Sequence, residues 1–179
     1  MVGEALPRPE YPRPQFRRQN WTNLTRSLDS TRPVVSNDGW EHALTDLYNI
    51  HDYRHAEALE KSYFTPESAV AAQPANRPVY VPGYDYRGEP ILITEFGGIA
   101  FSGEENGAEG WGYSTVADVE GFLESYESLI EALLRSEPIQ GFCYTQLTDV
   151  EQEINGLLAY DRKPKVDPAR VREINERAS

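Results

Sequence analysis

An apolar run that ends in one carboxylate and a pair of glycines constrains the fold of this chain more than any other feature. The run is ILITEFGG, over residues 91–98. Short continuous aliphatic runs are typical of parallel strands that are buried on both faces. A polar residue at the exit of such a strand points into a site at the carboxyl end of the sheet. Glu95 is therefore the leading candidate for a functional side chain, and the alternative is a solvated glutamate beside an ordinary glycine turn.

The rest of the chain alternates predicted strands with predicted helices. Strands are expected over residues 33–37, 47–51 and 139–147. Residues 54–63 have helical composition, and an apolar stripe over residues 116–135 predicts an amphipathic helix whose start Ser114 or Thr115 can cap. This alternation favours parallel βαβ units wound right-handed, so the predicted fold class is α/β.

Three stretches interrupt the alternation or end it. Residues 1–29 are rich in proline and lack the apolar periodicity of a helix, so we expect a disordered or loosely docked arm. Residues 64–90 carry five prolines and several aromatic residues, which predicts a long loop. Near the other end, Pro168 stands just inside a final predicted helix that Asp167 can cap.

The length and the charge of the chain argue against several classes of protein. Its 179 residues fall short of the roughly 250 of a complete (β/α)8 barrel. The net charge is −12, and no basic run could follow a phosphate backbone, so no nucleic-acid partner is expected. No apolar run could span a bilayer and the N-terminus lacks the apolar core of a secretion signal, so we expect a cytoplasmic chain without a membrane partner. The sole cysteine, Cys143, is predicted to be a buried thiol in a reducing compartment.

Several segments, in this order and spacing, resemble the catalytic barrel of glycoside hydrolase family 2. They are TRPVVSNDGW (31–40), DLYNIHDY (46–53), ITEFGG (93–98), GFCYTQLTD (141–149) and YDRKPK (160–165). Residues 11–24, YPRPQFRRQNWTNL, look like the opening of the same family's sugar-binding jelly roll. The resemblance implies a partial (β/α)8 barrel, approximately strands five to eight with their helices, over residues 30–179. Residues 1–29 are then an extended arm, a remnant of the sugar-binding domain.

The resemblance also implies roles for individual residues. Glu95 stands where the family has its catalytic nucleophile, and Tyr53 stands where a tyrosine hydrogen-bonds that nucleophile. Thr145 and Gln146 stand where several relatives have Trp-Asn, which leaves the preferred sugar open. From the residues alone, Tyr53 can also be a core tyrosine, and Trp40, which could stack on the face of a sugar ring, can also be a buried structural tryptophan. The residues expected to line the sugar pocket are Asn37, Asp38, Trp40, His51 and Gln146.

The function implied by the resemblance is hydrolysis of a terminal β-glycosidic bond through a covalent glycosyl-enzyme at Glu95, with a β-linked sugar as substrate and no cofactor. Retention needs a second carboxyl roughly 5 to 5.5 Å away, and the family's Asn-Glu pair that supplies it has no counterpart here. We therefore expect weak or no turnover by the isolated chain, with a preference for activated aryl glycosides. The acids expected on the same rim are Asp38, Glu41, Asp52, Asp149, Glu151 and Glu153.

The competing hypothesis is a non-catalytic carbohydrate-binding or assembly fragment that arises from an internal deletion or an imperfect gene model. No metal is expected, because His51 ends a predicted strand and cannot share a helix with His55, and His42 is the only further histidine. A half-barrel exposes two sheet edges with unpaired backbone groups, so we expect self-association or pairing with a complementing barrel half.

Overall fold

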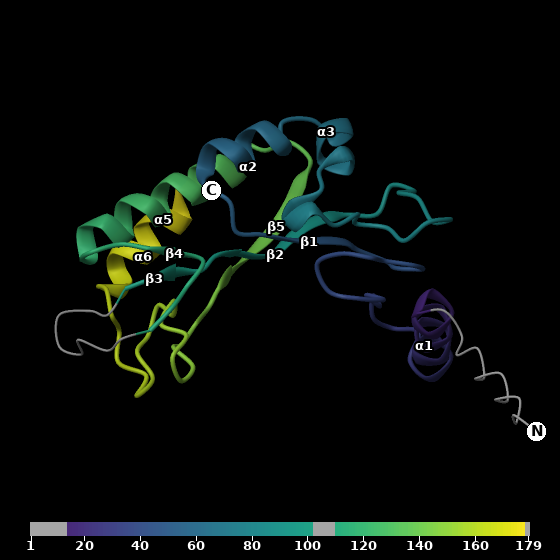
Figure 1. Ribbon diagram of the computed structural model, residues 1–179, viewed down its shortest axis with the longest axis horizontal. Helices are drawn as coiled ribbons and strands as arrows, with labels where there is room; N and C mark the ends of the chain where they lie inside the picture. The colour runs from purple at the N-terminus through teal and green to yellow at the C-terminus, as the bar shows by residue number, and fades with distance from the viewer. Residues whose placement is uncertain (1–13, 102–109, 178–179) are drawn as a thin grey trace, which may run out of the picture.

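The computed structural model describes residues 14–101 and 110–177 (Figure 1). No helix in these two ranges is both long and apolar enough to cross a membrane. In chain order the elements are α1 (Pro14–Leu28), β1 (Tyr48–Asp52), α2 (Ala56–Ser62), α3 (Pro66–Ala71), the 3-10 helix η1 (Pro74–Asn76), β2 (Ile91–Gly97), β3 (Ile99–Ala100), β4 (Ser114–Thr115), α5 (Val119–Leu134), β5 (Ile139–Thr145) and α6 (Pro168–Glu176).

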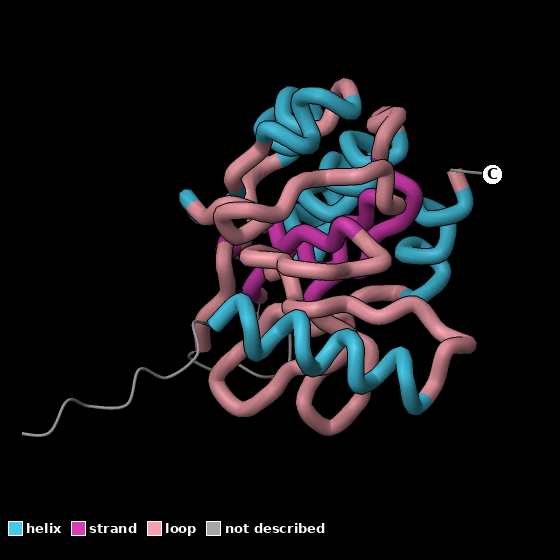
Figure 2. The backbone as a smooth tube through the Cα atoms, turned by 90° about the vertical axis from the view of Figure 1, so that its right-hand side faces the viewer, coloured by secondary structure: helices cyan, strands magenta, loops and turns pink. Residues whose placement is uncertain are grey.

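A three-stranded parallel sheet organises the described part of the chain. Its order is β1-β2-β5, so β2 is the central strand, and β3 pairs with β4 in a separate two-stranded ladder. Helices α2, α5 and α6 lie on one side of the sheet, whereas loops and α1 lie on the other (Figures 1 and 2). The predicted α/β class is confirmed, and the described residues form part of such a layer without closing into a barrel.

The hydrophobic core lies between the sheet and the helices. Helix α5 begins where the Asp118 side chain accepts a hydrogen bond from the backbone N–H of Gly121. Its apolar stripe joins residues of β1 and β2 in one buried cluster and contacts α2, β3 and β5. The most deeply buried side chains of this cluster include Tyr48, Ile50, Ile93, Phe96, Phe122 and Leu133. Burial of such side chains is worth about 1.5–3 kcal/mol each, so this cluster holds the strands in place.

A bulge in the pairing of β1 with β2 decides which way Glu95 points. Ile50 pairs with Ile93, but the next residue, His51, pairs with Glu95, so Thr94 is the extra residue. Ile93 and the following core residue Phe96 both face the helices although they are three positions apart. Thr94 and Glu95 therefore both lie outside the helix-side core, which strict alternation along the strand does not allow.

The structure corrects two predictions for the first 37 residues. Residues 14–28 form helix α1 rather than an extended arm, because every proline of the segment lies at or before Pro14 and a proline is well tolerated in a helix's first turn. Residues 1–13 lie outside the described part. The strand predicted over 33–37 is absent, because the Val34 backbone bonds to Asp46 instead of a sheet neighbour, with N to Oδ2 2.7 Å apart.

Other predictions need smaller corrections. The loop over 64–90 contains α3, whose N-cap Thr65 and Ser68 exchange hydrogen bonds, and η1. Asp118 caps α5, whereas Ser114 and Thr115 lie in β4. Cys143 is exposed and not buried, because the next residue, Tyr144, packs on α5 and alternation turns Cys143 to the opposite face of the sheet. The final helix is confirmed, with Asp167 bonded to the backbone N–H of Ala169.

Candidate active site

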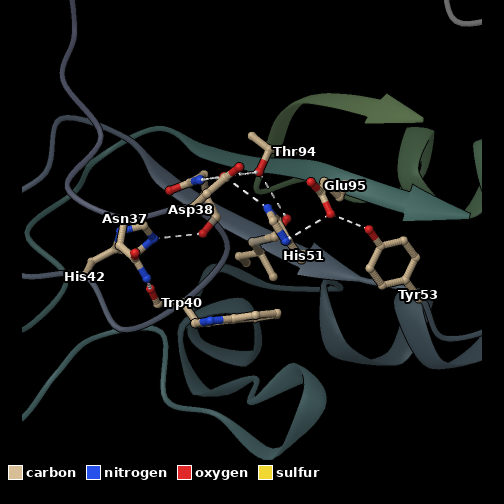
Figure 3. A network of polar contacts seen from close by, with 10 residues as sticks. Asn37, Asp38, Trp40, His42, His51, Tyr53, Thr94 and Glu95 are labelled. Atoms are coloured by element: carbon tan, nitrogen blue, oxygen red, sulfur yellow. Dashed lines mark hydrogen bonds and ion pairs between the residues drawn. The ribbon is translucent and has the colours of Figure 1, made fainter. Parts of the chain in front are cut away.

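Glu95 and Tyr53 meet at the carboxyl end of the sheet. Glu95 lies near the end of β2, and the Tyr53 hydroxyl, from the residue that follows β1, donates a hydrogen bond to Glu95 Oε2 (Figure 3). Burial raises the pKa of the Tyr53 phenol, and the hydrogen bond to Glu95 raises it further. The phenol therefore keeps its proton, and Glu95 Oε2 is held as the acceptor.

His51 lies between two carboxylates. Its Nδ1 is 3.1 Å from Glu95 Oε2, and its Nε2 is 3.0 Å from Asp38 Oδ1. The second contact does not have hydrogen-bond geometry, so the buried Nε2 has no hydrogen-bond partner in the described structure. His51 is 9% exposed, whereas the side chains of Glu95 and Asp38 are 35% and 63% exposed. The two carboxylates are thus open to solvent on either side of a buried imidazole.

Asp38 is positioned by donors from both strands. The Asn49 amide of β1 donates to Asp38 Oδ1, and the Thr94 hydroxyl of β2 lies 3.2 Å from the same oxygen (Figure 3). Carboxylate oxygens of Asp38 and Glu95 lie within 4.8 Å of each other and of a ring nitrogen of His51. Of the acids expected on the rim, Asp38 is the one that the described contacts bring to Glu95.

The turn before this site depends on Gly39. Gly39 has a φ of +78°, and a Cβ there lies only 2.5 Å from the His51 ring, so a side chain is excluded by both conformation and space. Trp40 meets the His51 ring edge to face, with centroids 5.3 Å apart, and the Arg77 guanidinium lies 5.0 Å from the centroid of the Trp40 ring. The Asn37 amide donates to the Trp40 carbonyl at 2.6 Å, which closes the turn.

Gln146 and two of the expected acids make other contacts. The Gln146 amide donates to Asn155 Oδ1 at 2.8 Å, which ties it to the following loop. Asp52 is buried and pairs with Arg54 at 2.6 Å. Asp149 pairs with the buried Lys165 at 2.9 Å, and burial lowers the pKa of that lysine. These contacts give Asp52 and Asp149 structural roles.

The three histidines do not share a metal site. His42 Nε2 contacts the Asn49 carbonyl at 2.9 Å, and His55 accepts from the Ala58 backbone N–H as the N-cap of α2. His51 instead lies beside Asp38 and Glu95. The ring nitrogen of His51 and the carboxylate oxygens of Asp38 and Glu95 are the ligand types that a divalent cation takes. The absence of a metal stays a prediction.

Sequence reasoning missed Asn49, Thr94 and Tyr113. Asn49 lies two residues before His51 on β1, so strand alternation places both on one face, and this spacing could have found it. Thr94 reaches the same face only through the bulge. Tyr113 stacks on Tyr53 with ring centroids 3.5 Å apart, and no sequence pattern signals a contact between residues so far apart.

The fold and the site define a class: a parallel α/β layer with a glutamate–tyrosine pair at the carboxyl end of its central strand. Solved structures that share this fold include several glycosidases. The chain aligns with a family 2 β-galacturonidase from Eisenbergiella tayi at 17% identity and a TM-score of 0.63, covering 91% of this chain and 30% of that one. It aligns with the Faecalibacterium prausnitzii β-glucuronidase at 18% identity and a TM-score of 0.53, covering 92% and 29%.

An exo-β-agarase also has this fold, at 16% identity and a TM-score of 0.53, covering 75% of this chain and 16% of that one. No protein-family model matches the sequence, and no curated protein matches it. The resemblance to glycoside hydrolase family 2 is thus confirmed at the level of the fold. The chain spans less than a third of each of these structures.

Proposed function

We propose that this chain carries the nucleophile side of a retaining β-glycosidase site. The observation that supports this most directly is the Glu95 carboxylate, which is partly exposed at the end of the central strand and accepts a hydrogen bond from Tyr53. A nucleophilic carboxylate must be held in one orientation while one oxygen stays free to attack. The contacts of Tyr53 and His51 are both to Oε2, so they leave Oε1 for this role.

In the proposed first step, a Glu95 oxygen forms a bond to the anomeric carbon while the bond from that carbon to the leaving oxygen breaks. The leaving oxygen takes the electron pair and a proton from water or from an acid. Water then attacks the same carbon, loses a proton and releases Glu95 as a carboxylate. Asp38 lies on one side of Glu95, and its exposed carboxylate provides a hydrogen-bonding group for the hydroxyls of the sugar (Figure 3).

The second carboxyl decides how fast this site turns over. An Asp38 oxygen lies within 4.8 Å of a Glu95 oxygen, but Asn49 and Thr94 already donate to the Asp38 oxygen that faces His51. We therefore assign Asp38 to substrate binding and expect slow turnover that favours activated aryl leaving groups. The competing function is that of a carbohydrate-binding fragment without catalysis. Such a fragment would bind the sugar through the same side chains, but Glu95 would not attack the anomeric carbon.

Covalent trapping separates these two functions. A 2-deoxy-2-fluoro-β-glycosyl fluoride slows the second step, so the glycosyl ester accumulates on the nucleophile. We expect a peptide containing residues 91–98 to gain the mass of the sugar at Glu95, and the Glu95→Gln variant to gain none. A panel of galactosyl, glucosyl, galacturonyl and glucuronyl reagents is used, because the structural neighbours include a β-galacturonidase and a β-glucuronidase. Binding without any label contradicts the proposal and favours the carbohydrate-binding fragment.

A further inference from the structure

Two exposed aromatic side chains lie next to the Tyr53–Glu95 pair and have no part in the chemistry proposed above. The Tyr113 ring lies almost parallel to the Tyr53 ring, at an interplanar angle of 4° and a centroid distance of 3.5 Å. Trp111 meets the Tyr113 ring edge to face at 5.9 Å. Tyr113 is 52% exposed and Trp111 is 50% exposed. Together the three rings form a continuous aromatic surface from the partner of Glu95 outward to solvent.

Backbone hydrogen bonds from two segments hold this surface in place. The Tyr113 N–H donates to the Gly98 carbonyl at 2.8 Å, directly after β2. The Trp111 N–H donates to the Gln152 carbonyl at 2.8 Å, and the Trp111 carbonyl accepts from Ile154 at 3.0 Å. A Cβ on Gly98 lies only 2.4 Å from the Tyr113 ring, so the glycine is what allows this close approach. The rings are therefore positioned before any ligand arrives.

The surface differs in chemistry from the opposite side of Glu95. Asp38 lies on one side and presents an exposed carboxylate, whereas Tyr53 lies on the other (Figure 3). Tyr113 stacks on Tyr53. A glycoside has the same two parts, because the reacting sugar is rich in hydroxyls and the leaving group often presents a flat apolar face. Flat apolar groups gain about 0.5–1.5 kcal/mol from stacking on an aromatic ring beyond the area they bury.

We propose that Trp111 and Tyr113 form a subsite for the leaving group of the glycoside, which takes an aryl ring or the apolar face of a second pyranose. The subsite rests on the proposed function in that it takes Glu95 as the attacking group. It adds a preference that Glu95 cannot supply, because the carboxylate contacts only the reacting sugar. The energy of one stacking contact corresponds to a selectivity of up to about tenfold.

The first test compares two trapping reagents with the same 2-deoxy-2-fluoro sugar, of which one releases fluoride and the other releases 2,4-dinitrophenolate. The measured quantity is the ratio of their second-order labelling rate constants. We expect Tyr113→Ala and Trp111→Ala each to lower the dinitrophenyl-to-fluoride ratio up to about tenfold. Phe64→Ala removes a side chain that is 68% exposed on another part of the surface, and its ratio should equal that of the unsubstituted chain. An unchanged ratio in both test variants overturns the subsite.

The second test is direct binding, which does not need the covalent step. Three ligands built on the same sugar are titrated into the protein: a methyl β-thioglycoside, a nitrophenyl β-thioglycoside and a thio-linked disaccharide. The measured signal is the NMR resonance of the Trp111 indole N–H. We expect the nitrophenyl compound or the disaccharide to shift this resonance and the methyl compound to leave it in place. A shift with the nitrophenyl compound indicates that the subsite takes an aryl group, and a shift with the disaccharide indicates that it takes a second sugar. Equal shifts with all three ligands, or none, overturn the subsite. If no reagent labels Glu95 but the indole still discriminates, the proposed function fails, and the two rings bind an aryl group or a second sugar without a leaving-group role.

Discussion

Tyr53 is the residue whose role can be tested with the smallest change. Tyr53→Phe removes the hydroxyl that donates to Glu95 and keeps the ring that stacks on Tyr113. A hydrogen bond to a charged group contributes about 1.5–3 kcal/mol, so we expect the rate of Glu95 labelling to fall about 10- to 100-fold. Mass spectrometry of the time course measures this. Tyr160→Phe, in an exposed loop, is the matched control, and equal rates in all three proteins contradict the assigned role.

Gly39 offers a second test, since its two constraints can be separated. Gly39→Ala places a methyl group 2.5 Å from the His51 ring at a φ of +78°. Gly83→Ala has a similar φ of +91° but meets no heavy atom within 4 Å. A left-handed alanine costs about 1 kcal/mol or more in either case. In urea titrations, we expect Gly39→Ala to lower the free energy of unfolding more than Gly83→Ala does. We also expect Glu95 to be labelled more slowly in Gly39→Ala. Equal losses of stability in the two variants would mean that the contact with His51 is unimportant.

Among the elements, α5 gives the sharpest contrast between sequence and structure. The sequence allows a cap at Ser114 or Thr115, but the observed cap is Asp118. Asp118→Ala should lower the free energy of unfolding by about 1 kcal/mol, because a backbone N–H at the helix start loses its acceptor. Ser114→Ala, in the exposed β4, should change it by less than about 0.5 kcal/mol. Urea denaturation followed by circular dichroism measures both, and the reverse order would place the cap at Ser114.

Taken as a whole, the molecule should lose stability in alkali. Burial, as the largest cause, raises the pKa of Tyr48, Tyr63, Tyr80 and Tyr144 above the usual 10.0. The folded state therefore keeps protons that the unfolded chain releases, so this contribution is complete below pH 10 and is lost as the pH rises further. We expect the urea midpoint to fall above pH 10, with tyrosinate absorbance rising as the helix signal disappears. Full tyrosinate absorbance near pH 10 with the helix signal intact would contradict this.

The open edge of the sheet leads to a prediction about association. Strand β5 lies at one edge, and its Phe142 is 37% exposed beside the exposed Cys143. Unpaired strand edges with apolar side chains recruit other strands. In the presence of a reductant, which excludes disulfides of Cys143, we expect the mass from light scattering to rise with concentration. Phe142→Lys should weaken this rise, and a monomeric mass at every concentration would mean that the described loops already cover the edge.

Much of the fold follows from local pattern. The apolar run at 91–97, the stripe of α5 and the Asp167–Pro168 helix start are each encoded within a few residues, so their elements could be predicted. Helix α1 and the missing strand at 33–37 could not, because the first rests on helical propensity without a clear apolar stripe and the second depends on a competing contact with Asp46. The exposure of Cys143 depends on which face of the sheet the helices cover, because Tyr144 faces α5 and Cys143 faces the other side.

The sequence by itself determined that Glu95 lies near the carboxyl end of a buried strand and that His51 lies near the end of a neighbouring one, because strand ends follow from short runs of residue types. The strand expected before Asp38 is absent, so the place of Asp38 beside them came only from the tertiary structure. Only the tertiary structure decided where these side chains point. The bulge between Ile50 and His51 turns Glu95 toward His51 and Tyr53, whereas unbroken alternation would leave it facing the helix core with Ile93. Pairing register depends on the neighbouring strand, so no single segment of sequence can encode it.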